Sequence, residues 1–237
     1  MMKRFSIKNK ETIATLITEE EYFELAQKEI SSLRQEIEDY IRTDPLFLKT
    51  FKPYRVSQNA PKIIQSMSKA SLVAGVGPMA SVAGAIAYFV VKALTEAGAE
   101  FVVFDNGGDI AFKINRQVTV GIYTGTTINN LGFCVQPRED IFGICTSSAS
   151  VGHSISFGQT DATTILSTDV ILADAVATAL GNDIKNVDST LINKSISQKM
   201  YAKIEGILVI IKEKIGLCGV LPQLKRVNIN YDIITKG

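Results

Sequence analysis

The spacing of apolar residues predicts a long amphipathic helix near the start of the chain. Between residues 19 and 43, apolar side chains recur every three or four positions, which is the repeat of one helix face. Thr18 and Glu21 stand three positions apart, as in a capping box that closes the first turn of a helix. We therefore expect this helix to begin beside Thr18 and to cover a sheet with its apolar face.

A second pattern, apolar on all sides, indicates a helix in the protein interior. The chain carries no charge from residue 71 to residue 91, a length that would cross a bilayer. The break Gly75-Val76-Gly77-Pro78 divides this stretch. We predict one helix over about residues 61–73 and a buried core helix over about residues 79–97, and we expect no membrane partner.

Strand-like segments occur before and after these helices, and Asp105-Asn106-Gly107-Gly108-Asp109 between two of them is a strong hairpin signal. The strands and helices come in groups rather than alternating one by one, which favours an α+β fold with an antiparallel sheet. We expect one domain over residues 1–237, and open sheet edges favour a homo-oligomer. The predicted strands are 5–8, 13–17, 101–104, 110–114, 118–123, 132–136, 142–146, 163–166, 207–211, 219–220 and 227–233.

Composition and charge exclude several classes of protein. The net charge is +1, so no nucleic-acid partner is expected. The three cysteines include no Cys-x-x-Cys pair, which argues against a disulfide framework or a zinc site. The first residues lack the apolar segment of a signal peptide. The expected location is therefore the cytoplasm.

The most informative stretch is the Ala-rich segment 173–180, which contains Asp174 and Thr178. A helix capped by Thr168 or Asp169 and ended by Gly181 would place both side-chain oxygens on one face, one turn apart. Oxygen ligands of this kind suit Mg²⁺. The alternative is a surface Asp and a Thr bonded to its own helix turn.

The charges around this helix favour the metal site. Residues 139–184 contain no Lys or Arg but several acids, and such a region concentrates cations. A phosphate there would need a metal ion or backbone amides. The alternative is that Lys and Arg side chains from other parts of the fold neutralise these acids.

Two further segments are candidates for binding or catalysis. The glycines of Asn106-Gly107-Gly108-Asp109 allow backbone N–H groups to approach a flat or anionic ligand, although a tight hairpin explains the same residues. His153 is the only histidine and titrates near neutrality, so it is a candidate general acid–base with Asp161 nearby in sequence. The alternative is a polar loop histidine without a catalytic role.

A dinucleotide-binding motif competes for the glycine-containing break. Residues 75–80 match G-x-G-x-x-A before an apolar helix, and Asp105 follows the next strand. An NAD-type oxidoreductase would need a strand directly before Gly75, whereas residues 62–71 have a helical pattern.

Three segments in order resemble the ApbE-type flavin transferase superfamily, and most closely a short branch found in archaea and bacteria without an assigned activity. They are Gly77-Pro78-Met79-Ala80 with the helix after it, residues 104–110, and residues 173–180. The last is the most specific, since it resembles the family's Ala-Asp-Ala-Leu-Ala-Thr-Ala helix. The resemblance covers about residues 70–185 and implies a T-fold-like antiparallel sheet packed against helices.

The resemblance also implies a role for individual residues. In full-length members the Asp and Thr of that helix bind Mg²⁺ with a backbone carbonyl, FAD lies against these elements, and FMN passes to a protein threonine. By position, Asp174 and Thr178 would be metal ligands with the Gly77 carbonyl, and His153 is the candidate catalytic histidine. The implied cofactor-binding residues are Gly77, Asn106, Gly107, Gly108, Asp109 and Ser148.

The expected function is that of a Mg²⁺-dependent enzyme that binds a flavin or related nucleotide and performs FMN transfer or FAD pyrophosphate cleavage. The family's loop lysine is replaced by Ala80, and the region between Cys145 and Thr163 is contracted. These departures motivate an alternative, a non-catalytic module that binds a nucleotide or a protein on the same scaffold.

Overall fold

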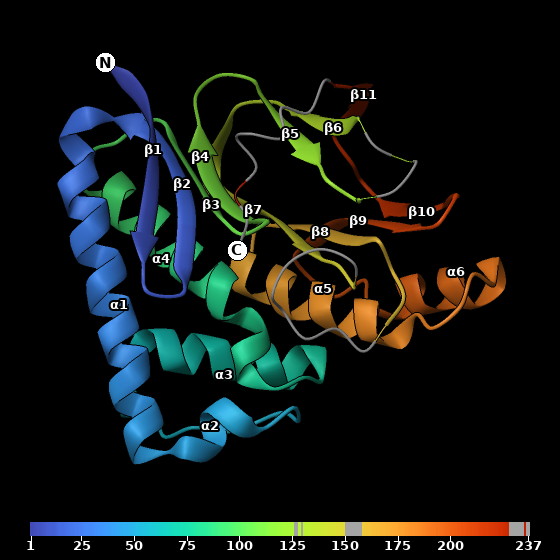
Figure 1. The fold of residues 1–237 in the computed structure, drawn as a ribbon, viewed down its shortest axis with the longest axis horizontal. Coiled ribbons are helices and arrows are strands. Elements are labelled where there is room, and N and C mark those ends of the chain that lie inside the picture. The colour runs from blue at the N-terminus through green and yellow to red at the C-terminus, as the bar shows by residue number, and fades with distance from the viewer. Residues whose placement is uncertain (126–127, 129, 150–157, 228–234, 236–237) are drawn as a thin grey trace.

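A large antiparallel sheet organises the structure, a computed structural model that describes residues 1–237 except 126–127, 129, 150–157, 228–234 and 236–237 (Figure 1). All neighbouring strands of the sheet are antiparallel, as the grouping of elements predicts. Its eight strands lie in the order β1 (Met2–Asn9), β2 (Thr12–Glu19), β3 (Val102–Asn106), β4 (Asp109–Ile114), β7 (Arg138–Ser147), β8 (Ala162–Ser167), β9 (Ile204–Ile211) and β10 (Lys214–Gly219).

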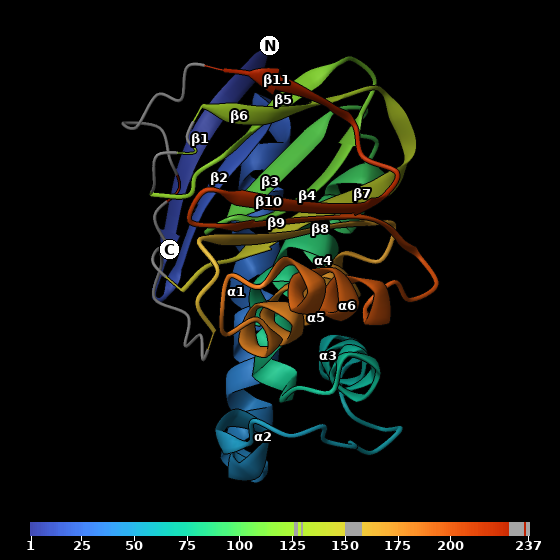
Figure 2. The same ribbon diagram turned by 90° about the vertical axis from the view of Figure 1, so that its right-hand side faces the viewer.

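Different layers cover the two faces of this sheet, as Figure 2 shows. A three-stranded sheet in the order β11 (Gln223–Arg226), β6 (Leu131–Val135) and β5 (Val118–Ile122) lies on one side. Helices lie on the other, which confirms the expected α+β class. They are α1 (Phe23–Thr43), α2 (Pro45–Lys49), α3 (Lys62–Ala74), α4 (Val82–Glu96), α5 (Val170–Asp183) and α6 (Ser189–Gln198), with the 3₁₀ turns η1 (Glu20–Tyr22) and η2 (Pro78–Ser81).

Alternation along the strands divides the buried side chains into two clusters, one on each face of the large sheet. Val102 and Phe104 of β3 belong to the cluster beneath the helices. Phe112 of β4 and Phe142 of β7 belong to the other cluster, with ring centroids 5.7 Å apart. Because side chains alternate between faces, the same strands support both layers.

The uncharged stretch forms interior helices, as predicted. Pro78–Glu96 is the one segment of the described residues with the length and composition to cross a membrane, and half of its apolar window is buried within the protein. Ala85, Val90 and Leu94 of α4 have no exposed surface, and α4 packs against α1, α5, β3 and β4. Packing within the fold therefore accounts for its apolar character.

The helix before Gly75 excludes the dinucleotide-binding interpretation. Residues Lys62–Ala74 form α3, and Gly75 ends this helix with a φ of 82°, a left-handed conformation that favours glycine. A dinucleotide fingerprint requires a strand at this place. The NAD-type oxidoreductase reading is therefore wrong for this chain.

Other sequence expectations need correction at element ends. The predicted capping box is wrong, because Thr18 lies in β2 and its hydroxyl donates to the Phe101 carbonyl (3.0 Å). The N-cap residue of α1 is Tyr22, whose side chain makes no capping hydrogen bond. Gly181 does not end its helix, since α5 continues to Asp183. Of the short strand expected at 219–220, Gly219 is the last residue of β10 and Val220 lies outside any strand. Most of the strand expected at 227–233 lies outside the described residues.

Candidate functional site

The helix that contains Asp174 is enclosed by the fold. Asp169 caps α5, because its Oδ1 accepts the backbone N–H of Leu172 (3.2 Å), as predicted. The helix packs against α3, α4, β7 and β8. Asp174 is only 7% exposed, and Thr178, one turn later, is half-buried. The alternative of an ordinary surface aspartate is therefore wrong.

The carboxylate of Asp174 meets the N-terminus of α4. The backbone N–H of Gly84 donates to Asp174 Oδ2 (2.8 Å), at the end of the helix where partial positive charge favours an anion. A Cβ at position 84 would lie 2.7 Å from the Asp174 Cβ, so the two helices approach this closely only with glycine there. Gly84 is not among the residues expected from the sequence, where a glycine within an apolar helix was the available signal.

A second buried carboxylate belongs to Asp109, the first residue of β4. Asp109 pairs with Cys145 of β7 and is 9% exposed. Its Oδ1 is buried and has no hydrogen-bond partner within the described part of the chain. Burial, and next the negative charge of Asp174, raise the pKa of Asp109 well above its ordinary value. A buried, unpaired carboxylate oxygen of this kind calls for a proton or a cation.

The pKa of Asp174 responds to two opposing influences. Burial raises it to about 7, while the hydrogen bond from the Gly84 amide acts in the opposite direction. Burial also raises the pKa of the Cys145 thiol well above its usual range. At neutral pH the two aspartates therefore share a site in which full ionisation of both is unfavourable without a positive counter-charge.

The oxygen atoms at this place fit a hard divalent cation. The candidate donors are the carboxylates of Asp174 and Asp109 and the hydroxyl of Thr178, and oxygen is the ligand that Mg²⁺ prefers. No cluster of three or more His, Cys, Asp or Glu with metal-binding placement occurs among the described residues. Two carboxylates and one hydroxyl are fewer ligands than a divalent cation takes, so water would have to complete its coordination shell, as it commonly does for Mg²⁺.

The glycine hairpin lies against the same end of α4. Gly107 and Gly108 have φ values of 70° and 101°, as a two-residue hairpin turn requires. The Asn106 side-chain amide donates to the Ala83 carbonyl of α4 (3.1 Å). The Gly108 N–H already donates to Asp105 Oδ1 (3.0 Å), so of the two glycines the exposed Gly107 is the better placed for a ligand.

The loop at Gly77 completes the surroundings of α5. A side chain at Gly77 would collide with the Thr50 carbonyl oxygen, so this position requires glycine. The Gly77 carbonyl accepts the Ala80 N–H (3.1 Å) at the start of η2, and η2 packs against α5. A carbonyl oxygen has a second lone pair that stays available to a cation.

Two further expected site residues belong to the segment that follows β7. Ser148 is half-buried and directly follows β7, in which the Thr146 N–H donates to the Gly108 carbonyl (3.2 Å), so Ser148 lies two residues beyond a contact with the glycine hairpin. His153 lies outside the described residues, as part of 150–157.

Among the expected positions, the structure places Asn106 and Asp174 against the first turn of α4 and Asp109 opposite Asn106 in the same hairpin. Thr178 lies one helical turn beyond Asp174, and Gly77 lies in the loop before η2.

Comparisons with known proteins identify the family of this chain. A family model described as "AbpE bacteria" matches residues 3–203. The UPF0280 protein of Archaeoglobus fulgidus is 45% identical over 241 residues, covering 100% of both chains. That of Methanocella arvoryzae is 44% identical over 238 residues, covering 100% of this chain and 97% of the relative.

Two solved structures share the fold at low sequence identity. The flavin transferase ApbE from Vibrio cholerae is 13% identical with a TM-score of 0.57, covering 94% of this chain and 97% of the other. The apo form of Pseudomonas stutzeri flavinyl transferase ApbE is 10% identical with a TM-score of 0.53, covering 92% and 94%. These likenesses confirm the expected ApbE-like fold.

Proposed function

The chain belongs to the family described as AbpE bacteria, and we propose that it is a Mg²⁺-dependent enzyme that acts on a flavin nucleotide, by FMN transfer or by cleavage of the FAD pyrophosphate. The observation that carries the proposal is the pair of buried carboxylates at the start of α4, one of which has an unpaired oxygen. The shared fold with structures named as flavin transferases supports the nucleotide class.

The residues proposed to hold Mg²⁺ are Asp174, Thr178 and the Gly77 carbonyl, with Asp109 as a further acidic group. When bound, Mg²⁺ would supply positive charge that offsets the negative charge developing on a diphosphate. The chain itself orients Asp174 through the Gly84 amide. The enclosed position of Asp174 also keeps bulk water from its carboxylate, which strengthens electrostatic interactions there.

The flavin is proposed to lie on the side of the β3–β4 hairpin. Asn106 fixes this hairpin against α4 through the Ala83 carbonyl, and Gly107 has no Cβ to keep a flat ring or a phosphate at a distance. Asp109 and Gly108 belong to the same turn. The roles of Ser148 in binding and of His153 as acid–base stay predictions from the sequence.

The test is incubation of the purified protein with FAD and Mg²⁺, with separation of FMN, AMP and any flavinylated threonine peptide. We expect FMN or flavinylated peptide to form only with the metal, and we expect calorimetry with FAD and Mg²⁺ to give binding. Binding without turnover would favour the non-catalytic module, for which Ala80 in place of the family lysine is the motivating feature. Absence of both binding and turnover would contradict the proposal.

Two further expectations belong to the same proposal. The edges of the large sheet within the described residues are β1 and β10, and open edges are suited to pairing with a second copy. A homo-oligomer and a cytoplasmic location are retained as predictions, to be checked by sedimentation velocity and by cell fractionation.

A further inference from the structure

An apolar surface with basic neighbours lies at one end of the molecule, around α2. Both views place α2 at the extremity farthest from the three-stranded sheet (Figures 1 and 2). Leu46 and Leu48 of α2 are 54% and 48% exposed, and Phe51 just after it is 62% exposed. We call this surface the basic-apolar tip; it consists of Leu46, Leu48, Lys49, Phe51, Lys52, Arg55, Lys69, Leu72 and Val73.

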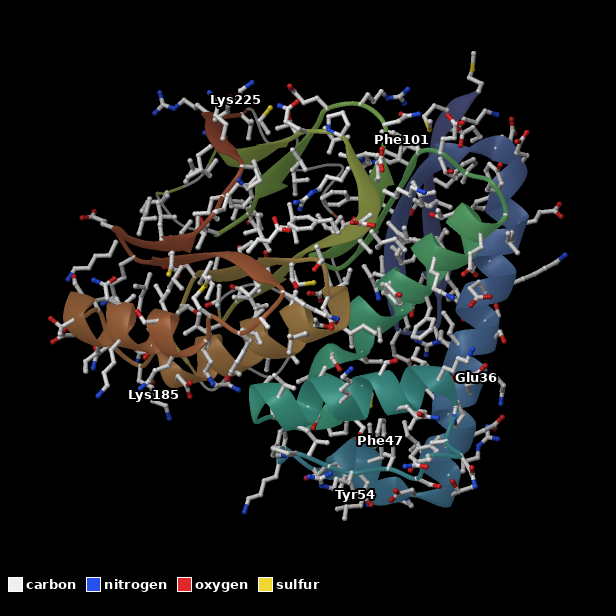
Figure 3. The ribbon with its side chains drawn as sticks, turned by 180° about the vertical axis from the view of Figure 1, so that it is seen from behind. Glu36, Phe47, Tyr54, Phe101, Lys185 and Lys225 are labelled. Carbon is white, nitrogen blue, oxygen red and sulfur yellow. The ribbon has the colours of Figure 1, made fainter. Side chains whose placement is uncertain are left out.

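The exposed leucines are held in place by a buried anchor. Phe47 between them has no exposed surface, and its ring packs edge-on against Tyr40 (5.2 Å between centroids) and Tyr54 (6.4 Å). The Tyr54 hydroxyl also donates to Asp44 Oδ2 (2.9 Å) directly before α2. Figure 3 shows Phe47 and Tyr54 side by side at this end. The exposure of Leu46 and Leu48 therefore belongs to a fixed structure.

The end of α3 extends the same surface. Tyr54 N–H donates to Ser71 Oγ (3.2 Å), and Ser68 Oγ donates to the Tyr54 carbonyl (2.6 Å). These bonds hold the segment after α2 along α3, where Leu72 and Val73 are 39% and 43% exposed. Five large apolar side chains, from α2, from the residue Phe51 and from the end of α3, are thus exposed in this part of the fold, whereas scattered single ones would need no explanation.

The charge of this part of the chain has one sign. From residue 45 to residue 95 the sequence contains no Asp or Glu, but six Lys and Arg. Lys49, Lys52, Arg55 and Lys69 are exposed and form no salt bridge within the described part of the chain. The nearby acid Asp44 is half-buried and bound to tyrosine hydroxyls.

We propose that the basic-apolar tip docks onto an anionic lipid surface, with its leucines between the headgroups and its lysines and arginine against lipid phosphates. Apolar side chains at a protruding end, surrounded by basic ones, match the chemistry of a membrane interface. The proposal concerns binding at the surface, not spanning, and it departs from the expectation that the protein has no membrane partner. It does not depend on the flavin chemistry.

Fluorescence provides a direct test because the chain has no tryptophan. Leu48→Trp places a single reporter on the tip, and Leu191→Trp on α6 is a control of matched exposure (48% and 49%). With vesicles of phosphatidylcholine and phosphatidylglycerol, we expect a blue shift and quenching by brominated lipid chains for Leu48→Trp only. An unchanged spectrum at low salt, or equal quenching of both variants, would overturn the proposal.

Co-sedimentation with the same vesicles measures the two contributions separately. Lys49→Glu/Lys52→Glu should weaken binding by more than tenfold, since each basic residue contributes about fivefold near an anionic surface. Leu46→Ser/Leu48→Ser should also weaken it by more than tenfold. Leu191→Ser/Lys194→Glu, placed on α6, is the matched control and should bind like the wild type, and 0.5 M salt should abolish binding.

Other occupants of the tip give different results. A second copy would make the wild type a dimer in sedimentation velocity that Leu46→Ser/Leu48→Ser converts to a monomer, and would leave vesicle binding absent. Binding to vesicles that all tip variants retain would place the lipid contact elsewhere. Either result overturns the proposal, and an unchanged melting temperature of each variant shows that the comparison is made between folded proteins.

Discussion

Two regions of the chain have opposite charge patterns, and the candidate site lies where they meet. Residues 45–95 contain no acid, and residues 139–184 contain no Lys or Arg. The first region supplies α4, and the second supplies α5, which packs against it. At this contact the counterpart of Asp174 is the backbone amide of Gly84.

Two other acids of the base-free region have a different kind of partner from Asp174. Asp169 and Asp183, at the two ends of α5, reach Lys203 and Lys199, each at 3.2 Å. For these two acids, Lys side chains from other parts of the fold neutralise the charge, as the alternative interpretation of the base-free region expects. Asp174, in the middle of the same helix, bonds to a helix N-terminus, which leaves its charge only partly compensated. Among these three aspartates, the difference singles out Asp174 as the one that still needs a cation or a proton.

The largest effect is expected from replacing that group. Asp174→Asn keeps an oxygen for the Gly84 amide but removes the negative charge, so Mg²⁺ binding in calorimetry should fall by more than 100-fold and turnover of FAD should be lost. Stability should not fall, because a buried charge has been removed. The matched control is Asp183→Asn at the exposed end of α5, which should bind Mg²⁺ like the wild type. Equal Mg²⁺ binding by both variants would refute the assignment.

The contribution of α4 to its contact with α5 is tested by adding one methyl group at Gly84. Gly84→Ala would gain about 1 kcal/mol of helix propensity, but its Cβ would lie 2.7 Å from the Asp174 Cβ. Overpacking of this kind costs about 1–3 kcal/mol, so we expect a lower free energy of unfolding and weaker Mg²⁺ binding.

A second helical glycine provides the control. A Cβ at Gly181 of α5 would meet Thr160 Oγ1 at 3.5 Å, an ordinary contact, so Gly181→Ala should be neutral or stabilising by up to about 1 kcal/mol. Urea denaturation of both variants measures the difference. If Gly84→Ala were the more stable of the two, the close approach of α4 and α5 would have no energetic consequence.

Local patterns in the sequence predict much of the frame of this site. The apolar stretch predicts interior helices, and Gly107-Gly108 predicts the hairpin. Both predictions succeed because helix burial and a left-handed turn depend on residues that are neighbours in the sequence. The bond between Gly84 and Asp174 spans 90 residues, and no local pattern reports such a contact. Thr18 shows the same limit, since a partner 83 residues away takes the hydroxyl that a capping box would use.

Short, exposed helices and strands are a second part of the fold that local sequence patterns do not predict. Helix α2 has five residues, too few for a helical period to show. Strand β10 has mostly exposed residues, so its sequence lacks the apolar run that marks a buried strand. Both elements are positioned by neighbours, α2 through Phe47 and β10 through pairing with β9.

A smaller effect is expected at the second carboxylate. Asp109→Asn removes the acid whose pKa is raised by burial and by Asp174. Without Mg²⁺, the melting temperature should therefore rise or stay level at neutral pH. Mg²⁺ affinity should fall by about tenfold, since one charge near the ion is lost. The discriminating measurement is the Mg²⁺-induced shift in melting temperature, and a shift as large as that of the wild type would exclude Asp109 from the site.

The smallest expected effect concerns Asp105, which lies next to Asn106 on β3 and therefore points to the opposite face of the sheet. Burial raises the pKa of its carboxyl, against hydrogen bonds from Thr235 and Gly108 and the charge of Arg4. A raised pKa means that the folded state holds the proton more tightly, so the free energy of unfolding should fall as pH rises from below the ordinary value of 3.8 through the folded pKa.

The slope from one such proton is at most about 1.4 kcal/mol per pH unit. Asp105→Asn removes this titration, so the difference in free energy of unfolding between wild type and variant should change with pH in that range and level off on either side. Urea titrations at a series of pH values measure it, and a difference that stays constant with pH would contradict the sign derived from burial. Because Asp105 faces away from α4 and only its charge acts on Asp109, its variant should change Mg²⁺ binding less than Asp109→Asn does. That result would support a metal site on the face of the sheet that is covered by α4 and α5.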